Sequence, residues 1–540
     1  MRSALLLSLL SVLLAACADA PPLHHDIGAV HRDVTTASPA AQRWFDRGLA
    51  NCFGFNHAAA LECFEQAIAA DPDCAMAHWG VAYALGPNYN AAEVEPEACE
   101  RAYKALVAAN KAKGKSRRET ALIEAFFARH PDGEASDRAA RDAAYAAAMR
   151  RLHRKYRDDA DIAAFTAEAV MQLNPWKLWS NTGEPAPQIP EIRGILEPAL
   201  RRAPNHPALC HLYIHAMEAG PLADRATPAA ERLENLTPGL GHLVHMPSHI
   251  YIWTGRYADS LRVNQRAVAV DDEFFGDDPK VGMYALYRIH NLHFIAYSGM
   301  WTGQSEVALA AAKQISSDIP APMITAMADF VDVFTATPFH VMVRFGMWDE
   351  ILAEPEPAHP EQFAARAIWR YARGIALAVL GRTDEATAEL AEFERAREAM
   401  PASRLLFNNA AKDILAVADD VLRGELAYRR GEYDSAFEHL HRAVKLDEQL
   451  NYDEPWGWME PARHALGALL TEQGRFAEAA VVYQENLERY PNNGWALHGL
   501  RECLRGMGRD TEARALTSRF EAAWANADVQ IPGSCFCRTR

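Results

Sequence analysis

The stretch WFDRGLANCFGFNHAAALECFEQAIAADP, residues 44–72, has the pattern of two short helices packed antiparallel against each other. Small residues recur where two helix backbones would approach, an aromatic residue fills the space between them, and a proline follows the second helix, which it cannot continue. Six positions carry this pattern: Trp44, Gly48, Ala60, Phe64, Ala67 and Pro72. The stretch therefore predicts a helical hairpin of a kind that forms repeat arrays.

The same pattern recurs in the C-terminal half and continues through the middle of the chain. Further units lie at 374–390, at 424–443, and at Gly467, Gly474, Ala479, Tyr483 and Pro491. Pro204 and Pro238 lie 34 residues apart, which is the period of the tetratricopeptide repeat (TPR) that these positions resemble. The resemblance implies an all-α fold, namely a TPR helical solenoid (α-α superhelix). Two loop insertions interrupt the repeats.

Composition and motifs divide the chain into successive segments. We expect a signal peptide (1–16), a lipidated N-terminal tether (17–40), N-terminal TPR-like helices (41–173), a Pro/Trp-rich insertion (174–190), histidine-rich TPR units (191–355) that contain an acidic insertion (271–281), C-terminal TPR units (356–526) and a tail (527–540).

The N-terminus predicts export. Arg2 precedes an apolar run from Leu5 to Leu14, which is too short for a lasting transmembrane anchor. Small residues before Cys17 resemble the lipobox of bacterial lipoproteins, which implies lipid on the Cys17 sulfur and a location on the periplasmic side of a bacterial membrane. An ordinary cleaved signal peptide remains the alternative.

The net charge of −16 bears on the partners of the protein. Acidic residues are spread over the chain, so most of the surface would repel a polyphosphate. We therefore expect no nucleic acid partner.

Histidines recur in register with the repeats. His211 and His215 form one H-x-x-x-H pair, His245 and His249 form another, and each histidine of the first pair lies 34 residues before its counterpart. Numbered from the start of each unit, these histidines occupy the fifth and ninth positions. His242 takes the second position of the unit that contains His245. In the next unit His290 takes the second position, His293 the fifth and Tyr297 the ninth, and in the unit after that His340 takes the ninth. The TPR resemblance implies that these positions face the concave groove.

Imidazoles at matching positions of adjacent helices can meet at one metal ion. Residues four apart on a helix have Cβ atoms about 5–6 Å apart, and packed helices run about 8–10 Å apart. The predicted ligands are His211, His215, His245, His249, His290, His293 and His340, which suffice for one or two ions. Glu218, on the same stripe, is a further candidate ligand or general base, and Tyr297 a candidate catalytic residue that shapes a substrate pocket. Pro247, between His245 and His249, should kink the helix and so change the direction of one ring relative to the other.

The ligand types leave several functions open. A histidine-rich set suits copper, zinc or iron. Three histidines per ion would favour an oxidoreductase, whereas a zinc pair with Glu218 as base would favour a hydrolase. We lean to the oxidoreductase because no second carboxylate is evident near the cluster. Metal storage or delivery would use the same site without chemistry. The alternative is a scaffold that binds a peptide or protein partner in the groove without metal.

The segment GHLVHMPSHIY, residues 241–251, resembles a motif of a group of bacterial TPR proteins. This resemblance supports the repeat fold and implies no particular activity.

Overall fold

The computed structural model describes residues 26–91, 93–134, 137–276 and 283–538. The expected signal peptide and Cys17 lie outside the described residues. Within the described ranges no helix is both long and apolar enough to span a bilayer.

The N-terminal third consists of antiparallel helices. The first of them, α2, has a proline at its first position, and the Ser38 side chain caps its N-terminus. Its helices are α2 (Pro39–Phe53), α3 (His57–Ala70), α4 (Ala75–Ala84), α5 (Pro96–Lys111), α6 (Arg117–Phe126), α7 (Arg138–Lys155) and α8 (Ala160–Met171).

The middle third carries the histidine-rich helices. Its elements are α9 (Ile189–Arg202), α10 (Pro207–Met217), η2 (Ala223–Ala226), α11 (Thr227–Leu233), α12 (Gly241–His245), α13 (Pro247–Trp253), α14 (Tyr257–Phe275), α15 (Met283–Thr302), α16 (Ser305–Asp318), α17 (Ala321–Val331), η3 (Val333–Ala336), α18 (Thr337–Arg344) and α19 (Trp348–Ala353).

The C-terminal third is helical except for one short hairpin. Its elements are α20 (Phe363–Val379), α21 (Thr383–Glu398), β1 (Leu405–Leu406), β2 (Asn409–Ala410), α22 (Ala411–Arg429), α23 (Tyr433–Gln449), α24 (Ala462–Glu472), α25 (Phe476–Arg489), α26 (Gly494–Gly506), α27 (Asp510–Ala515) and α28 (Thr517–Ala523). β1 and β2 pair antiparallel and form the single sheet of the described residues. The predicted all-α helical solenoid is confirmed.

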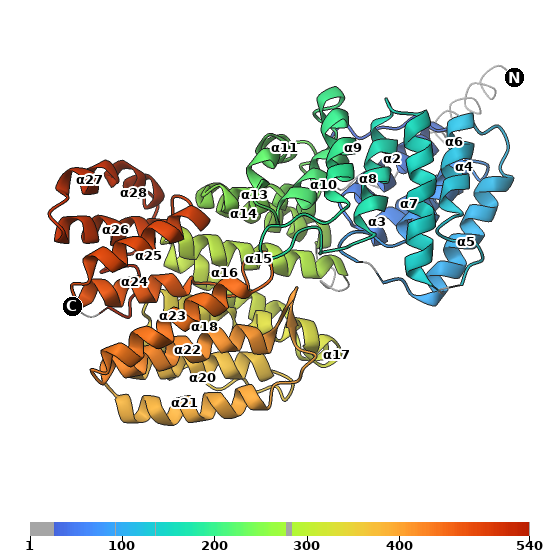
Figure 1. Ribbon diagram of the computed structural model, residues 1–540. Helices are drawn as coiled ribbons and strands as arrows, with labels where there is room; N and C mark the ends of the chain where they lie inside the picture. Colours follow the sequence, from blue (N-terminus) through green and yellow to red (C-terminus); the bar gives the residue numbers. More distant parts are fainter. Residues whose placement is uncertain (1–25, 92, 135–136, 277–282, 539–540) are drawn as a thin grey trace, which may run out of the picture.

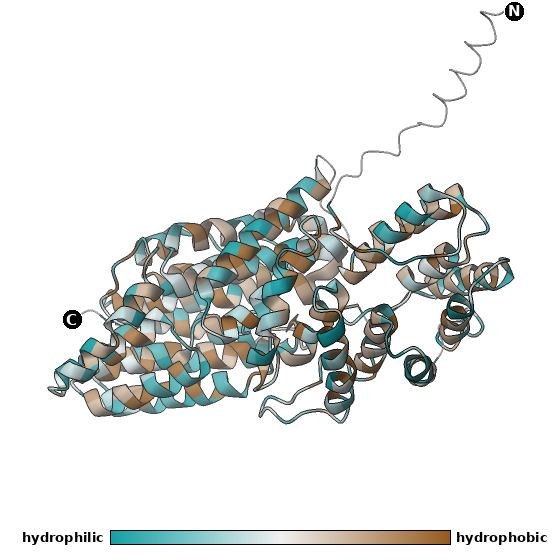
Figure 2. Ribbon diagram, turned by 90° about the horizontal axis from the view of Figure 1, so that it is seen from above, coloured by the Kyte–Doolittle hydropathy of each residue, from teal (hydrophilic) through white to brown (hydrophobic). Residues whose placement is uncertain are grey.

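The N-terminal helices α2 to α8 lie at one end of the molecule, and the C-terminal helices α26, α27 and α28 lie at the other (Figure 1). Most ribbons carry both hydrophilic and hydrophobic residues, as expected for helices with one face toward a core (Figure 2). The C-terminal helices fold back onto the middle of the chain. The Trp495 indole N–H donates to the carbonyl of Met300 at 2.8 Å, and the Asp528 carboxylate accepts from the backbone N–H groups of Ser305 (2.8 Å) and Glu306 (3.0 Å).

Glycines allow the close helix contacts that the sequence pattern predicted. The ring of Phe64 lies between Gly48 and Gly80, and a Cβ atom at those positions would come within 2.6 Å and 2.4 Å of ring atoms. Tyr483 lies in the same way between Gly467 and Gly499, where an added Cβ atom would come within 2.6 Å and 2.2 Å of its ring atoms. The small residues are therefore a steric requirement of the repeat.

Gly80→Ala should lower the free energy of unfolding by about 1–3 kcal/mol, because the added methyl group has no space beside Phe64. The matched control is Gly194→Ala within α9, where a Cβ atom would meet nothing within 4 Å. That substitution should stabilise the protein by roughly 0.5–1 kcal/mol through helix propensity. Urea denaturation of both variants measures the difference, and equal effects would contradict this interpretation of the packing.

The two insertions differ from expectation in extent. Residues 174–188 have no helix and contain one isolated bridge between Trp179 and Pro185, so the first insertion is present. The second is shorter than predicted. α14 continues to Phe275, whose side chain is buried, and buried Asp271 accepts a hydrogen bond from Asn291, so the acidic stretch begins as helix. Residues 277–282 lie outside the described ranges.

A further irregular segment, 450–461, interrupts the C-terminal units between α23 and α24. We call it the 450s loop. The sequence analysis missed it, although Pro455, Trp456 and Trp458 give it the same composition as the first insertion.

The buried apolar residues form two large clusters. One runs from Val30 to Tyr287 and the other from Ile252 to Cys537, and Trp253 packs against both. Both clusters draw residues from α13 and α15, which carry His249, His290 and His293. Ligand sites are frequent at such boundaries between cores.

Candidate metal centre

Six histidines converge where the two cores meet. They come from α10 (His211, His215), α12 (His242, His245), α13 (His249) and α15 (His290). They form two groups in which one ligand atom from each residue lies within 4.8 Å of the others. We call His211, His215 and His242 the first triad, and His245, His249 and His290 the second triad. Five of the seven predicted ligand histidines thus lie together, and His242, which was not predicted as a ligand, joins them.

The histidines are buried, and this differs from the open groove implied by the TPR resemblance. Their exposed fractions are between 0 and 7 %. The ring of Phe55, between α2 and α3, lies 4.5 Å from that of His211, and Tyr89 lies 5.2 Å from His215. Trp176 of the first insertion and the 450s loop complete the cover. The site is therefore internal, because segments from distant parts of the chain close over the groove.

The first triad presents nitrogens that lack a protein partner. His211 Nδ1 donates to the carbonyl of Phe53 at 2.7 Å, which leaves its Nε2 as the acceptor nitrogen. His215 Nδ1 donates to Glu218 Oε1 at 2.8 Å, which leaves Nε2 of His215 as the acceptor nitrogen too. Both Nε2 atoms are buried without a hydrogen bond, as are both nitrogens of His242. Unsatisfied buried nitrogens that face one another require an explanation.

The second triad has two acceptor nitrogens in direct contact. His245 Nδ1 lies 2.6 Å from Asn264 Oδ1, and the Asn264 amide N–H₂ donates to the carbonyl of Ser260, so Oδ1 faces the imidazole and His245 Nδ1 is the donor. His249 Nδ1 lies 2.6 Å from Glu218 Oε2. The Nε2 atoms of the two rings are 2.6 Å apart. With both Nδ1 atoms acting as donors, two lone pairs would face each other unless a proton or a metal cation lies between them. Burial lowers the pKa of His249, but Glu454 and Glu218 outweigh burial and raise it to about 10, so a proton on His249 Nε2 takes this place in the metal-free protein and a metal ion would replace it.

Glu218 connects the two triads. Its two oxygens accept hydrogen bonds from His215 of the first triad and from His249 of the second. Burial raises the pKa of a carboxyl group, but the two imidazoles outweigh burial and hold the pKa of Glu218 well below its usual value. The sequence predicted Glu218 as a ligand or a general base. In the structure Glu218 lies in the cluster as a carboxylate that orients two candidate ligands.

Glu454 of the 450s loop is a second carboxylate that the sequence analysis missed. Its Oε2 lies 2.8 Å from His249 Nδ1 and accepts a hydrogen bond from the Tyr452 hydroxyl at 2.9 Å. Burial and the Glu218 charge raise the pKa of Glu454. The expectation of no second carboxylate is wrong, because Glu454 reaches the cluster across the superhelix from far along the chain. Only the unusual composition of the loop signalled it.

The remaining predicted residues lie apart from the triads. The ring of His293 packs against Phe334 and that of His340 against Trp458. Burial and the neighbouring His340 lower the pKa of His293 to about 3. Tyr297 contacts Trp301 and Trp456 and lies among apolar residues. Within the described ranges these three residues belong to no group of three potential ligands, whereas His242 does.

Pro247 interrupts the helix as expected. α12 ends at His245 and α13 begins at Pro247. His245 and His249 flank this break, and their rings stand at 78° with centroids 4.6 Å apart.

A pocket of about 200 Å³ adjoins the second triad, and His290 and Glu454 form part of its wall. We call it the aromatic pocket. A wider cavity of about 600 Å³ lies between the first insertion and the residues around Tyr452, and the two spaces share Trp176 and Asn408 in their linings.

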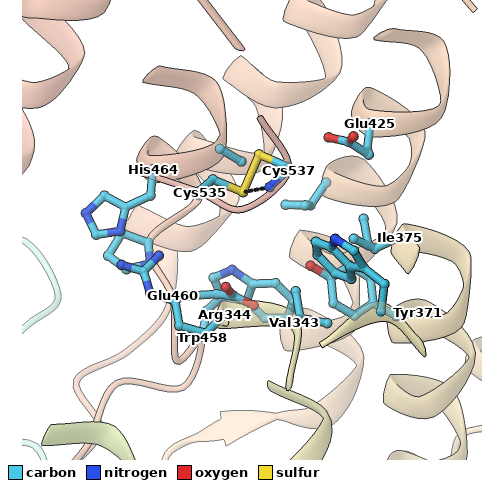
Figure 3. A pocket seen from close by; sticks show the side chains of 15 residues that line it. Val343, Arg344, Tyr371, Ile375, Glu425, Trp458, Glu460, His464, Cys535 and Cys537 are labelled. Carbon is cyan, nitrogen blue, oxygen red and sulfur yellow. Dashed lines mark hydrogen bonds between the residues drawn. A yellow bond between two sulfur atoms is a disulfide. The ribbon is translucent and has the colours of Figure 1, made fainter. Parts of the chain in front are cut away.

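A separate buried polar region lies beneath the C-terminal tail (Figure 3). Arg344 stacks 3.5 Å over the ring of Trp495, and Glu460 lies in the same pocket. Burial lowers the pKa of Arg344 to about 9 and raises that of Glu460 to about 7. Cys535 and Cys537 form a disulfide here. The pocket measures about 30 Å³, which is the volume of about one water molecule, so it is no candidate for a substrate.

Comparisons with known proteins concern the fold. Residues 470–528 match the tetratricopeptide repeat family model. No curated protein matches the sequence. Among solved structures, a human IFIT1 dimer with m7Gppp-AAAA is similar over 84 % of this chain and 90 % of that chain, with 13 % identity and a TM-score of 0.33. The APC/C hetero-tetramer Cut9-Hcn1 is similar over 90 % of this chain and 74 % of that chain, with 11 % identity and a TM-score of 0.30.

Proposed function

We propose that the two triads each bind one transition-metal ion and that the chain is a metalloenzyme with a dinuclear centre. One observation carries the proposal. The Nδ1 atoms of His211, His215, His245 and His249 are held by acceptors, so that each ring turns its Nε2 toward the cluster. This is the usual support of a metal-bound histidine, whose other nitrogen donates to a carbonyl or a carboxylate.

A third group of potential ligands, His215, Glu218 and His249, overlaps with both triads. A neutral imidazole has one lone pair, so His215 and His249 can each serve only one ion. Binding through the third group would need both Nδ1 atoms to give up their hydrogen bonds to Glu218. Two ions, one in each triad, keep those hydrogen bonds and use all six histidines.

The donor set favours copper or zinc over the third candidate, iron. Each triad supplies three imidazole nitrogens, and both oxygens of Glu218 are occupied by N–H donors. Non-haem iron sites commonly include a carboxylate ligand, whereas imidazole alone suits copper and zinc.

We propose an oxidoreductase. Although Glu454 is a second carboxylate near the cluster, Glu218 is a poor hydrolytic base, because burial raises its pKa but His215 and His249 outweigh burial and hold the pKa well below the usual value. The rings of His215 and His249, one from each triad, have centroids 5.9 Å apart, so the two sites adjoin. Bound copper would supply exchange of electrons with dioxygen. The chain orients the imidazoles and, through Phe55 and Phe294, excludes water from them.

Dioxygen consumption tests this function. Protein loaded with copper and desalted should consume dioxygen in the presence of a small organic reductant, and His245→Ala treated in the same way should lose at least about tenfold of the rate. The rate of His464→Ala serves as the control, since His464 is buried near Asn486 and outside both triads. Equal rates for all three proteins would contradict a role for the triads.

The match of residues 470–528 to the TPR family favours a second candidate, a scaffold that binds a peptide or protein. In that case the helical surface would bind the partner and the histidines would be structural. Protein that takes up no metal but binds a peptide partner would support this function.

We also propose that the protein is exported and anchored by lipid on Cys17 on the periplasmic side of a bacterial membrane. The apolar run before Cys17 supports this. Mass spectrometry of the mature N-terminus tests it, since an unmodified N-terminus that lacks Cys17 would contradict it.

A further inference from the structure

The aromatic pocket has walls suited to a planar ring. Phe330, Phe334 and Phe407 surround one side with centroids 5.3–5.7 Å apart and nearly perpendicular or tilted planes. Trp176 and Tyr287 lie on other sides. Aromatic rings prefer such edge-to-face and offset neighbours. A dry apolar cavity of about 150 Å³ can hold benzene, so the aromatic pocket, at about 200 Å³, accommodates a substituted benzene ring.

Two polar groups of the pocket lie beside the second triad. His290 and Glu454 both line the pocket, and both adjoin His249. The Nδ1 atom of His290 is buried and has no hydrogen-bond partner. A carboxyl oxygen of Glu454 can accept a hydrogen bond in either protonation state. A ring bound in the pocket would therefore find two hydrogen-bonding partners beside the proposed metal centre.

The charge of the pocket restricts the ligand further. No lysine or arginine is among the described residues that line it, and Glu454 is the single ionisable acid there. A carboxylate or phosphate on the ligand would be buried without a cationic partner, which is costly. An uncharged ring with a hydroxyl donor satisfies both the walls and Glu454.

We propose that the aromatic pocket binds small uncharged phenols, with the ring among Phe330, Phe334 and Phe407 and the hydroxyl directed at Glu454 and His290. Phenols are then the substrate class of the metal centre, an inference that rests on the proposed function. The wider cavity beside Trp176 and Asn408 is the route of entry.

Isothermal titration of the full-length protein with three probes tests the proposal. 4-Methylphenol should bind at least about tenfold more tightly than toluene, which lacks the hydroxyl, and more tightly than 4-methylbenzoate, which carries a charge. Leu286→Trp, which fills the pocket, and Phe407→Ala, which removes part of its wall, should each weaken 4-methylphenol binding at least tenfold. The aromatic control Phe520→Ala, on α28, should leave it unchanged.

The titration is run on metal-free and on copper-loaded protein. The aromatic walls and Glu454 are not proposed metal ligands, so the order of affinities should be the same in both. Equal binding of toluene, tighter binding of 4-methylbenzoate, or 4-methylphenol binding unaffected by Leu286→Trp would overturn the proposal. Protein that binds copper in the triads but no phenol would refute the substrate class and leave the metal centre intact. Phenol binding by protein that takes up no metal would refute the metal centre instead.

Discussion

Glu218→Gln should weaken the binding of both metal ions, by about 10–100-fold at each triad. The carboxylate accepts from His215 and from His249, and so holds one ligand of each triad with Nε2 free. A glutamine side chain has one acceptor oxygen, and its amide N–H₂ would face an imidazole N–H. One of the two histidines must then rotate or change its protonated nitrogen, and both triads are disturbed by a change of one atom.

Competition with a chelator of known affinity measures this effect. The control is Glu425→Gln, which neutralises another buried glutamate, near Arg429 and away from the triads. Glu425→Gln should leave both metal affinities unchanged. Weakening at only one site, or at neither, would show that Glu218 does not support the two triads together.

Saturation with metal should raise the free energy of unfolding by about 5 kcal/mol. An ion that binds only the folded state at a free concentration of 100 times its Kd stabilises by about 2.7 kcal/mol, and the two triads provide two such sites. Urea denaturation with and without metal measures the change.

The matched control is the double variant His211→Ala, His245→Ala, which loses one ligand from each triad. Its stability should be nearly independent of added metal. A stabilisation of the same size in this variant would mean that the ions bind elsewhere.

The repeat period predicted which helices would bring histidines together. His211 and His245 lie one repeat apart, and so do His215 and His249, and in the structure these four residues provide two ligands to each triad. This part of the site follows from local periodicity, since each unit places equivalent residues on the same side of the solenoid.

The ligand from α15 shows where the register failed. The sequence pattern favoured His293 as the equivalent of His245, but the ring of His290 is the one that lies 4.7 Å from His245. α15 runs from Met283 to Thr302 and carries both histidines. A shift of three residues is almost one helical turn, which exchanges one histidine for the other.

The closure of the site could not be predicted from spacing. Trp176, Tyr89 and Glu454 reach the histidines from segments that are distant in sequence, and their positions depend on the path of the whole superhelix. Repeat patterns describe contacts between neighbouring units. The repeat pattern predicted histidines in an open groove, whereas the fold buries these histidines.

The metal content of protein purified without a histidine tag tests the central claim most directly. After exposure to copper or zinc and removal of unbound ion, elemental mass spectrometry should find two ions per wild-type chain, one in His211→Ala, one in His245→Ala and none in the double variant. Wild-type protein without bound metal, or single variants that retain both ions, would contradict the assignment of one ion to each triad.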